Sequence, residues 1–118
     1  MDKRKAALKE AMTLYVNKEA ESGAPMQTNY PLYIDGFLTG FKKEADTIPP
    51  EHELYFQIAC LDNDFLQSLA NITYSSLNEA LKNHDVFDQR PLVFAYGFLH
   101  GTEAVENLTK NVQKPYVN

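Results

Sequence analysis

Gly36-Phe37-Leu38-Thr39-Gly40 and Gly97-Phe98-Leu99-His100-Gly101 are two copies of one pentapeptide that differ at a single position. They contain four of the five glycines in this chain of 118 residues. Both copies lie in segments with helical periodicity, where each glycine costs about 1 kcal/mol relative to alanine. The usual compensation is the close approach of another backbone, ring or ligand over the bare Cα. The pentapeptides therefore mark places where something packs tightly.

The segments around the two pentapeptides predict two apolar helices. The first spans 31–45, with Pro31 suited to its first turn, where a missing N–H costs nothing. The second runs from Pro91 to about Val112, and its first half, 92–99, is apolar on every side. A helix without a polar face is typical of the centre of a domain. Each pentapeptide follows a Pro-Leu pair, but the two Pro-Leu pairs are 60 residues apart and the two pentapeptides 61. We therefore interpret the copies as two helices with the same packing requirement, not as a proven repeat.

Two further segments have helical spacing of apolar residues. The segment 2–21 places Leu8, Ala11, Met12, Tyr15 and Val16 on one side. The segment 51–83 repeats apolar residues every three or four positions, and Phe65 and Ile72 belong to that expected inner face. Asp62-Asn63-Asp64 interrupts it, Asp64 with Gln67 fits a capping box, and the sequence leaves open one long helix or a break.

No segment alternates with a period of two, so the sequence predicts an all-α fold. We expect a compact bundle of four to five helices, packed closely through glycine, in one domain over 1–118. The residues 26–30 are expected to connect two helices, 83–88 to form a loop and 114–118 to form a frayed tail.

Composition limits the class of protein. The chain is 44% hydrophobic and 23% charged, as in ordinary globular proteins, and it has no apolar run long enough to cross a membrane. The basic start lacks the apolar stretch of a signal peptide, so we expect a cytoplasmic protein without membrane contact. The single cysteine, Cys60, is expected to be a small buried side chain.

Charge is distributed unevenly along the chain. Residues 1–18 carry a net charge of +3 and the whole chain −5, which leaves −8 for the remaining 100 residues. Positions 44–81 contain no Lys or Arg. Direct nucleic-acid binding is therefore not expected, because it depends on Lys and Arg. The distribution is compatible with a basic partner, or with a neighbouring copy that offers its basic N-terminal helix.

The glycine pairs admit three arrangements. Two helices of one domain can cross closely there, with Phe37 and Phe98 on the flanks. One stripe can instead face outward and form a seam between identical copies. The third arrangement is a groove for a flat ligand, floored by glycine and walled by aromatic rings.

Motifs for catalysis are absent from the sequence. There is no phosphate-binding loop, dinucleotide fingerprint or nucleophile elbow. His100 and Glu103 lie three residues apart and share a helix face, which allows a metal site if an acidic residue from another helix joins them. A lone histidine beside glycines is more often a hydrogen-bonded core residue, so no metal or cofactor is predicted.

Aromatic side chains suggest where a binding surface could lie. Seven Tyr and seven Phe are a generous supply for this length, and Tyr is favoured at interfaces. We expect such a surface near Tyr30, Tyr33 and the Arg90-Pro91 loop. A nucleotide-like ligand would need Arg90 with Lys42 or Lys43 for its charge.

We therefore expect a non-enzymatic helical binding protein that forms a homodimer and either occupies a partner protein or sequesters a small ligand. In style the chain resembles the compact accessory, inhibitor or anti-defence proteins of phages and mobile elements, through composition and not through any motif. The alternatives are a module for a nucleotide-like ligand and a small metal-binding protein or enzyme using His100 and Glu103. The candidate contact residues are Tyr30, Tyr33, Gly36, Phe37, Gly40, Arg90, Tyr96, Gly97, His100 and Gly101.

Overall fold

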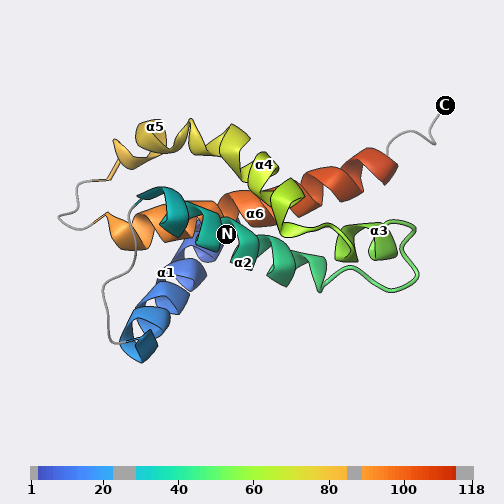
Figure 1. The fold of residues 1–118 in the computed structure, drawn as a ribbon, viewed down its shortest axis with the longest axis horizontal. Coiled ribbons are helices and arrows are strands. Elements are labelled where there is room, and N and C mark those ends of the chain that lie inside the picture. Colours follow the sequence, from blue (N-terminus) through green and yellow to red (C-terminus); the bar gives the residue numbers. More distant parts are fainter. Residues whose placement is uncertain (1–2, 23–28, 85–88, 114–118) are drawn as a thin grey trace.

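The computed structural model describes residues 3–22, 29–84 and 89–113, and within them the fold is all-α, as predicted (Figure 1). Most of the predicted loop 83–88 and the predicted tail 114–118 lie outside the described residues. The described helices are α1 (Lys3–Ser22), α2 (Asn29–Ala45), α3 (Tyr55–Ala59), α4 (Asn63–Tyr74), α5 (Leu77–Leu81) and α6 (Arg90–Gln113).

The fold is built on α2 and α6, which lie side by side and run in the same direction (Figure 1). Asn29 and Tyr30 already belong to α2, so the predicted connection 26–30 ends earlier than expected. The first half of α6 is buried on all sides, as its apolar sequence predicted, with Val93, Phe94 and Ala95 wholly inaccessible to solvent.

The four glycines lie where these two helices cross. A Cβ added to Gly36 would meet the carbonyl oxygen of Phe94 at 2.2 Å, and one added to Gly40 would meet that of Phe98 at 2.1 Å. Such distances are far shorter than van der Waals contact, so only a residue without a Cβ fits. Each glycine instead directs a Cα–H bond at a carbonyl oxygen, the geometry of the weak Cα–H···O contacts found between close helices.

The contact is reciprocal. A Cβ on Gly97 would approach the carbonyl oxygen of Tyr33 to 2.3 Å, and one on Gly101 would approach that of Phe37 to 2.2 Å. The two glycine stripes therefore cover each other, which is the first of the three predicted arrangements. The glycines are buried at this crossing, so they form neither an outward seam nor the floor of an open groove.

The segment between α2 and α6 returns across the pair as three short helices (Figure 1). The predicted helix 51–83 is thus broken, which raises the number of described helices above the four or five expected. The capping box predicted for Asp64 and Gln67 is wrong. Asp62 is the N-cap of α4, and its carboxylate accepts a 2.9 Å hydrogen bond from the Phe65 amide.

The break changes which side of the segment faces inward. Leu66 and Ala70 form the buried side of α4, and Leu77 and Leu81 that of α5. Phe65 is 45% exposed and Ile72 71% exposed, so their predicted inward position is wrong. In the sequence, the apolar spacing continues without a change across the helix ends. In the structure, each new helix has its own orientation, so the buried side changes from one helix to the next. Cys60, which follows α3, is also exposed and not buried.

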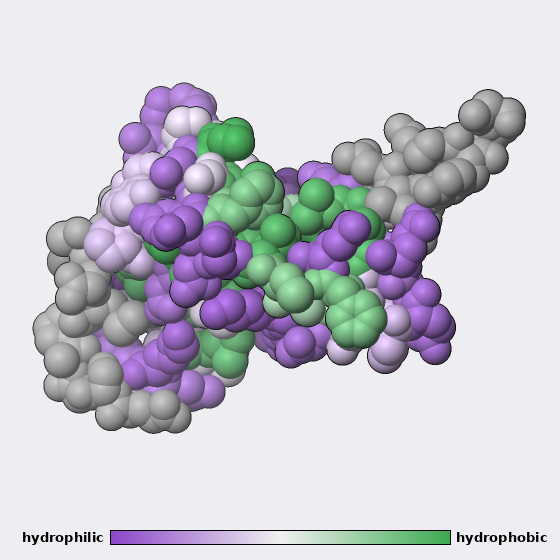
Figure 2. All heavy atoms as spheres, turned by 45° about the vertical axis from the view of Figure 1, so that its right-hand side comes forward, coloured by the Kyte–Doolittle hydropathy of each residue, from purple (hydrophilic) through white to green (hydrophobic). Residues whose placement is uncertain are grey.

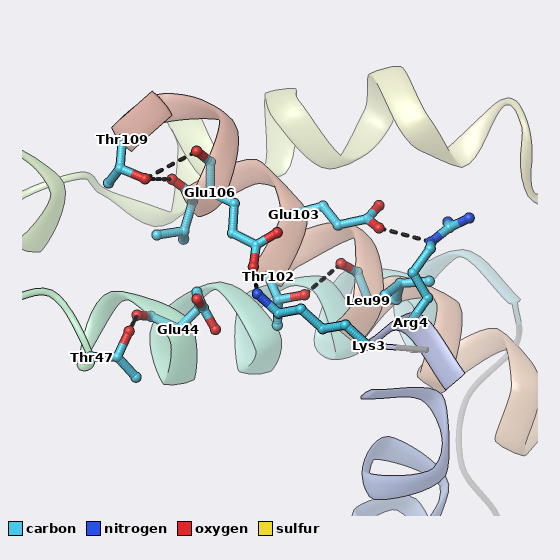
Figure 3. A network of polar contacts seen from close by, with 10 residues as sticks. Lys3, Arg4, Glu44, Thr47, Leu99, Thr102, Glu103, Glu106 and Thr109 are labelled. Atoms are coloured by element: carbon cyan, nitrogen blue, oxygen red, sulfur yellow. Dashed lines mark hydrogen bonds and ion pairs between the residues drawn. The ribbon is translucent and has the colours of Figure 1, made fainter. Parts of the chain in front are cut away.

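The first helix packs against α6 through a narrow face. Ala11 and Tyr15 are buried, and the Tyr15 ring lies 5.9 Å from that of Phe94. The predicted inner face was too wide, because Met12 and Val16 are 37% and 57% exposed. At the start of α1, the Arg4 guanidinium lies 2.8 Å from the Glu103 carboxylate (Figure 3). Part of the basic N-terminal charge is therefore paired within the chain.

The glycine crossing leads to a stability prediction. Gly101→Ala places a methyl group against the Phe37 carbonyl, so the helices must separate. We expect a net loss of about 2 kcal/mol or more, in spite of the better helix propensity of alanine. Urea denaturation measures the effect, with Ser68→Ala on the exposed side of α4 as the control. A stability equal to that of the native chain would contradict the close crossing.

Candidate functional site

A half-buried polar cluster, centred on Tyr33, links the two central helices to α4. Tyr33 is completely buried on α2, yet its hydroxyl lies 2.6 Å from Thr73 Oγ1 on α4 and 2.5 Å from His100 Nδ1 on α6. Burial raises the pKa of Tyr33 to about 12, so its hydroxyl stays protonated at neutral pH. The cluster therefore joins three helices through one phenol group.

The His100 ring is held in place by this cluster. Burial lowers the pKa of His100, with a smaller opposing effect from Glu103, so the neutral imidazole is favoured. Since Nδ1 faces the Tyr33 hydroxyl, Nε2 is the nitrogen left for another contact. His100 is hydrogen-bonded, as expected, but it is half-buried at the edge of the core and not fully inside it.

Other tyrosines connect α4 and α5 to the central pair. Tyr30 donates a 2.6 Å hydrogen bond to the side-chain oxygen of Asn71 and packs edge-on against Tyr74 at 5.1 Å. The Tyr96 hydroxyl lies 2.7 Å from Nε2 of His84, just after α5. These tyrosine hydroxyls thus act as internal links.

Beside the polar cluster lies a hollow of about 260 Å³ between α4 and α6. Its polar lining comes from Thr73, His100, Glu103 and Asn107. Its apolar walls are Phe37, Leu69, Ile72, Ala104 and Leu108. The two acidic residues of this part of α6 are paired with the start of α1: Glu103 with Arg4, and Glu106 with Lys3 (Figure 3).

An exposed apolar stripe on α4 extends this hollow. Phe65, Leu69 and Ile72 are spaced by four and three residues, so they share one helix face. Figure 2 shows apolar side chains gathered across the middle of the face that it presents. We call the hollow together with this stripe the α4–α6 groove, defined by Phe65, Leu69, Ile72, Ala104 and Leu108.

A second, wider hollow of about 680 Å³ lies along α1. Leu8, Met12 and Val16 supply its apolar lining on α1, and Lys5 and Lys9 its positive charge. We call this surface the α1 outer face, defined by these five residues. It borders the contact of α1 with α6, because Leu92 of α6 and His84 also line the hollow.

The predicted contact residues do not converge on one surface. Tyr33 is buried, Tyr30 contacts α4, and Arg90 lies 3.8 Å from Glu19 on α1. Only Phe37 and His100 of the predicted set line the hollow between α4 and α6. Thr73 was not predicted as a site residue, because no sequence pattern marks it. The residues of the α4 stripe were predicted to lie in the core.

The alternatives that need charge or metal receive little support. Lys42 lines a different hollow, near α3, and Lys43 is paired with Glu10. The cations proposed for a nucleotide therefore do not line the hollow between α4 and α6. Among the described residues, no group of three or more His, Cys, Asp or Glu side chains is placed to hold a metal ion. Within that same part of the chain, no helix is long and apolar enough to span a membrane.

Comparisons with known proteins add no relative. No protein-family model, curated protein or solved structure matches this chain.

Removing the buried hydroxyl tests the polar cluster. Tyr33→Phe leaves Thr73 Oγ1 and His100 Nδ1 without their shared partner, so we expect a loss of about 1–3 kcal/mol in the free energy of unfolding. Tyr30→Phe is the matched control, because its hydroxyl is exposed and water can replace it. Equal effects of the two substitutions in urea denaturation would contradict a structural role for the cluster.

The lowered pKa of His100 predicts a pH dependence. The unfolded chain takes up the proton near the ordinary value of 6.5, whereas the folded chain takes it up only at lower pH. Stability from this residue is therefore complete above about pH 6.5 and falls as the pH drops below it. We expect His100→Gln to flatten this fall between about pH 7 and pH 5.5, measured as free energies of unfolding. Parallel pH profiles of the two proteins would be inconsistent with a buried neutral His100.

Proposed function

We propose that this chain is a non-enzymatic, cytoplasmic binding protein that occupies a partner protein by accepting an amphipathic helix in the α4–α6 groove. The observation that carries the proposal is the apolar stripe beside the hollow, in which Phe65 and Ile72 are exposed and Leu69 is half-buried. Apolar residues spaced in this way on two adjacent helices provide the surface that a helix-in-groove contact requires.

The dimensions favour a helix over a compact small molecule. The hollow of about 260 Å³ lies below the roughly 300–1,000 Å³ of most small-ligand pockets. The stripe from Phe65 to Ile72 adds about 10 Å along α4, at 1.5 Å per residue. An occupant that uses both features is elongated.

The charge around the groove favours a basic occupant. Asp62 and Asp64 are exposed at the start of α4, and the chain from 44 to 81 lacks any Lys or Arg. Glu103 and Glu106 contribute less, because Arg4 and Lys3 already pair with them. A partner helix with an apolar face and basic residues at one end complements this arrangement.

The contacts of His100 and Glu103 within the chain support a non-enzymatic role. His100 and Glu103 are the pair best suited to acid–base or metal chemistry. The first is held by Tyr33 and the second by Arg4. A protein that covers a partner's helix acts as an inhibitor or accessory of that partner, which agrees with the class suggested by its composition.

A small ligand remains the second candidate, and one observation favours it. His100 and Asn107 both line the hollow, so an uncharged molecule with one polar group can find a hydrogen bond there beside apolar walls. Such a ligand would raise the melting temperature in a thermal-shift screen, whereas a helix-binding protein would respond only to peptides.

Two designed peptides test the proposal. An 18-residue amphipathic helix of Leu and Lys should bind at micromolar concentration at low salt, and its Leu/Glu twin should not. We expect Ile72→Lys to weaken binding at least tenfold, because it adds like charge to the stripe without disturbing the core. Phe56→Lys on α3 is the matched control, because Phe56 is exposed and lies outside the groove, and it should leave peptide binding unchanged. In isothermal titration, equal binding of both peptides, or no effect of Ile72→Lys, would refute the groove as the binding site.

A further inference from the structure

The α1 outer face has the chemistry that the α4–α6 groove requires. Leu8, Met12 and Val16 recur every four residues and supply apolar contact, while Lys5 and Lys9 are exposed at the N-terminal end of that stretch. From Leu8 to Val16 the stretch is about 12 Å long, close to the roughly 10 Å of the stripe on α4.

We infer that the occupant of the groove is α1 of a second copy of this chain. The inference rests on the proposed function, since it names the partner helix for the same groove. The two apolar stretches face each other, and the opposite charges lie at corresponding ends of the two helices.

The distribution of charge fixes the direction of docking. Asp62 and Asp64 lie at the N-terminal end of the α4 stripe, and Lys5 and Lys9 at the N-terminal end of the α1 stretch. A parallel arrangement places these charges together and leaves Met12 and Val16 opposite Leu69 and Ile72. An antiparallel arrangement would place the lysines over Ile72 and lose the attraction.

The chain's own α1 is not available for this groove. Its inner face is fixed on α6 by Ala11 and Tyr15, and Lys18 lies 3.3 Å from Asp35 of α2. The outer face lies about a quarter-turn around the same helix, on the flank of this contact. Because α1 packs on α6, its outer face would meet an α4 in another molecule. Two such contacts related by a two-fold axis would close a dimer, which is the commonest symmetry of homo-oligomers.

Charge reversal tests this contact. In sedimentation equilibrium at low salt, we expect the native chain to exceed its monomer mass of 13.4 kDa as its concentration rises. The double variant Lys5→Glu/Lys9→Glu and the variant Asp64→Lys should each weaken self-association at least tenfold. An equimolar mixture should associate again, because both contacts of a mixed pair are then complementary. The matched controls are Lys82→Glu and Glu79→Lys on α5, which change the charge outside both surfaces.

The outcomes separate this inference from the proposed function. A mass of 13.4 kDa at all concentrations, with binding of the Leu/Lys peptide intact, would overturn the second copy as partner and leave the groove as the site for another protein. Self-association that none of the α1 or α4 variants changes would also overturn it, because the interface would then lie elsewhere. A chain that neither associates nor binds the peptide would refute both.

Discussion

The contact on which the rest of this structure depends is between the backbones of α2 and α6. Each helix directs two glycine Cα–H bonds at two carbonyl oxygens of the other, four residues apart in every case. Such a contact tolerates no side chain, so it fixes both the distance between the helices and their register. Because the two helices run in the same direction, the chain between them must return across the pair, and α3, α4 and α5 make that return.

That constraint explains the position of the polar cluster. The register set by the glycines brings Tyr33 of α2 beside His100 of α6. His100 is itself part of the second pentapeptide. The single difference between the two copies, Thr39 against His100, therefore has a structural meaning. Thr39 bonds back to its own helix at the carbonyl of Asp35, whereas His100 bonds across to α2. Thr73 adds α4 to the same hydroxyl, so α4 is held at a defined place beside α6.

Much of this architecture could be predicted from the sequence, and the reasons differ between elements. The burial of residues 92–99 followed from a helix without a polar face, and the glycine pairs correctly indicated a close crossing. The site was harder to predict. Phe65 and Ile72 continue the apolar period of their neighbours, so nothing local separates them from core residues. They are exposed because the predicted helix is broken before α4. Asp62 caps the new helix, which turns a different side toward the core.

The partnership of Tyr33 with Thr73 was beyond sequence reasoning for another reason. It joins residues 40 positions apart, and neither belongs to a recognisable motif. The tyrosines were expected to mark a binding surface. In the structure, the hydroxyls of Tyr33, Tyr30 and Tyr96 instead form hydrogen bonds within the chain. The recognition surface that we propose consists instead of aliphatic and Phe side chains that the pattern had assigned to the interior.

The central claim is tested most directly by nuclear Overhauser spectroscopy on the labelled protein. The account predicts cross-peaks from the α-protons of Gly97 to the amide proton of Phe37, since a Cβ at Gly97 would lie 3.0 Å from that nitrogen. Corresponding cross-peaks should join the α-protons of Gly36 to the amide proton of Phe98, whose nitrogen would lie 3.1 Å from a Cβ at Gly36. Glycine α-protons with contacts only inside their own helix would contradict the crossing and the groove built beside it.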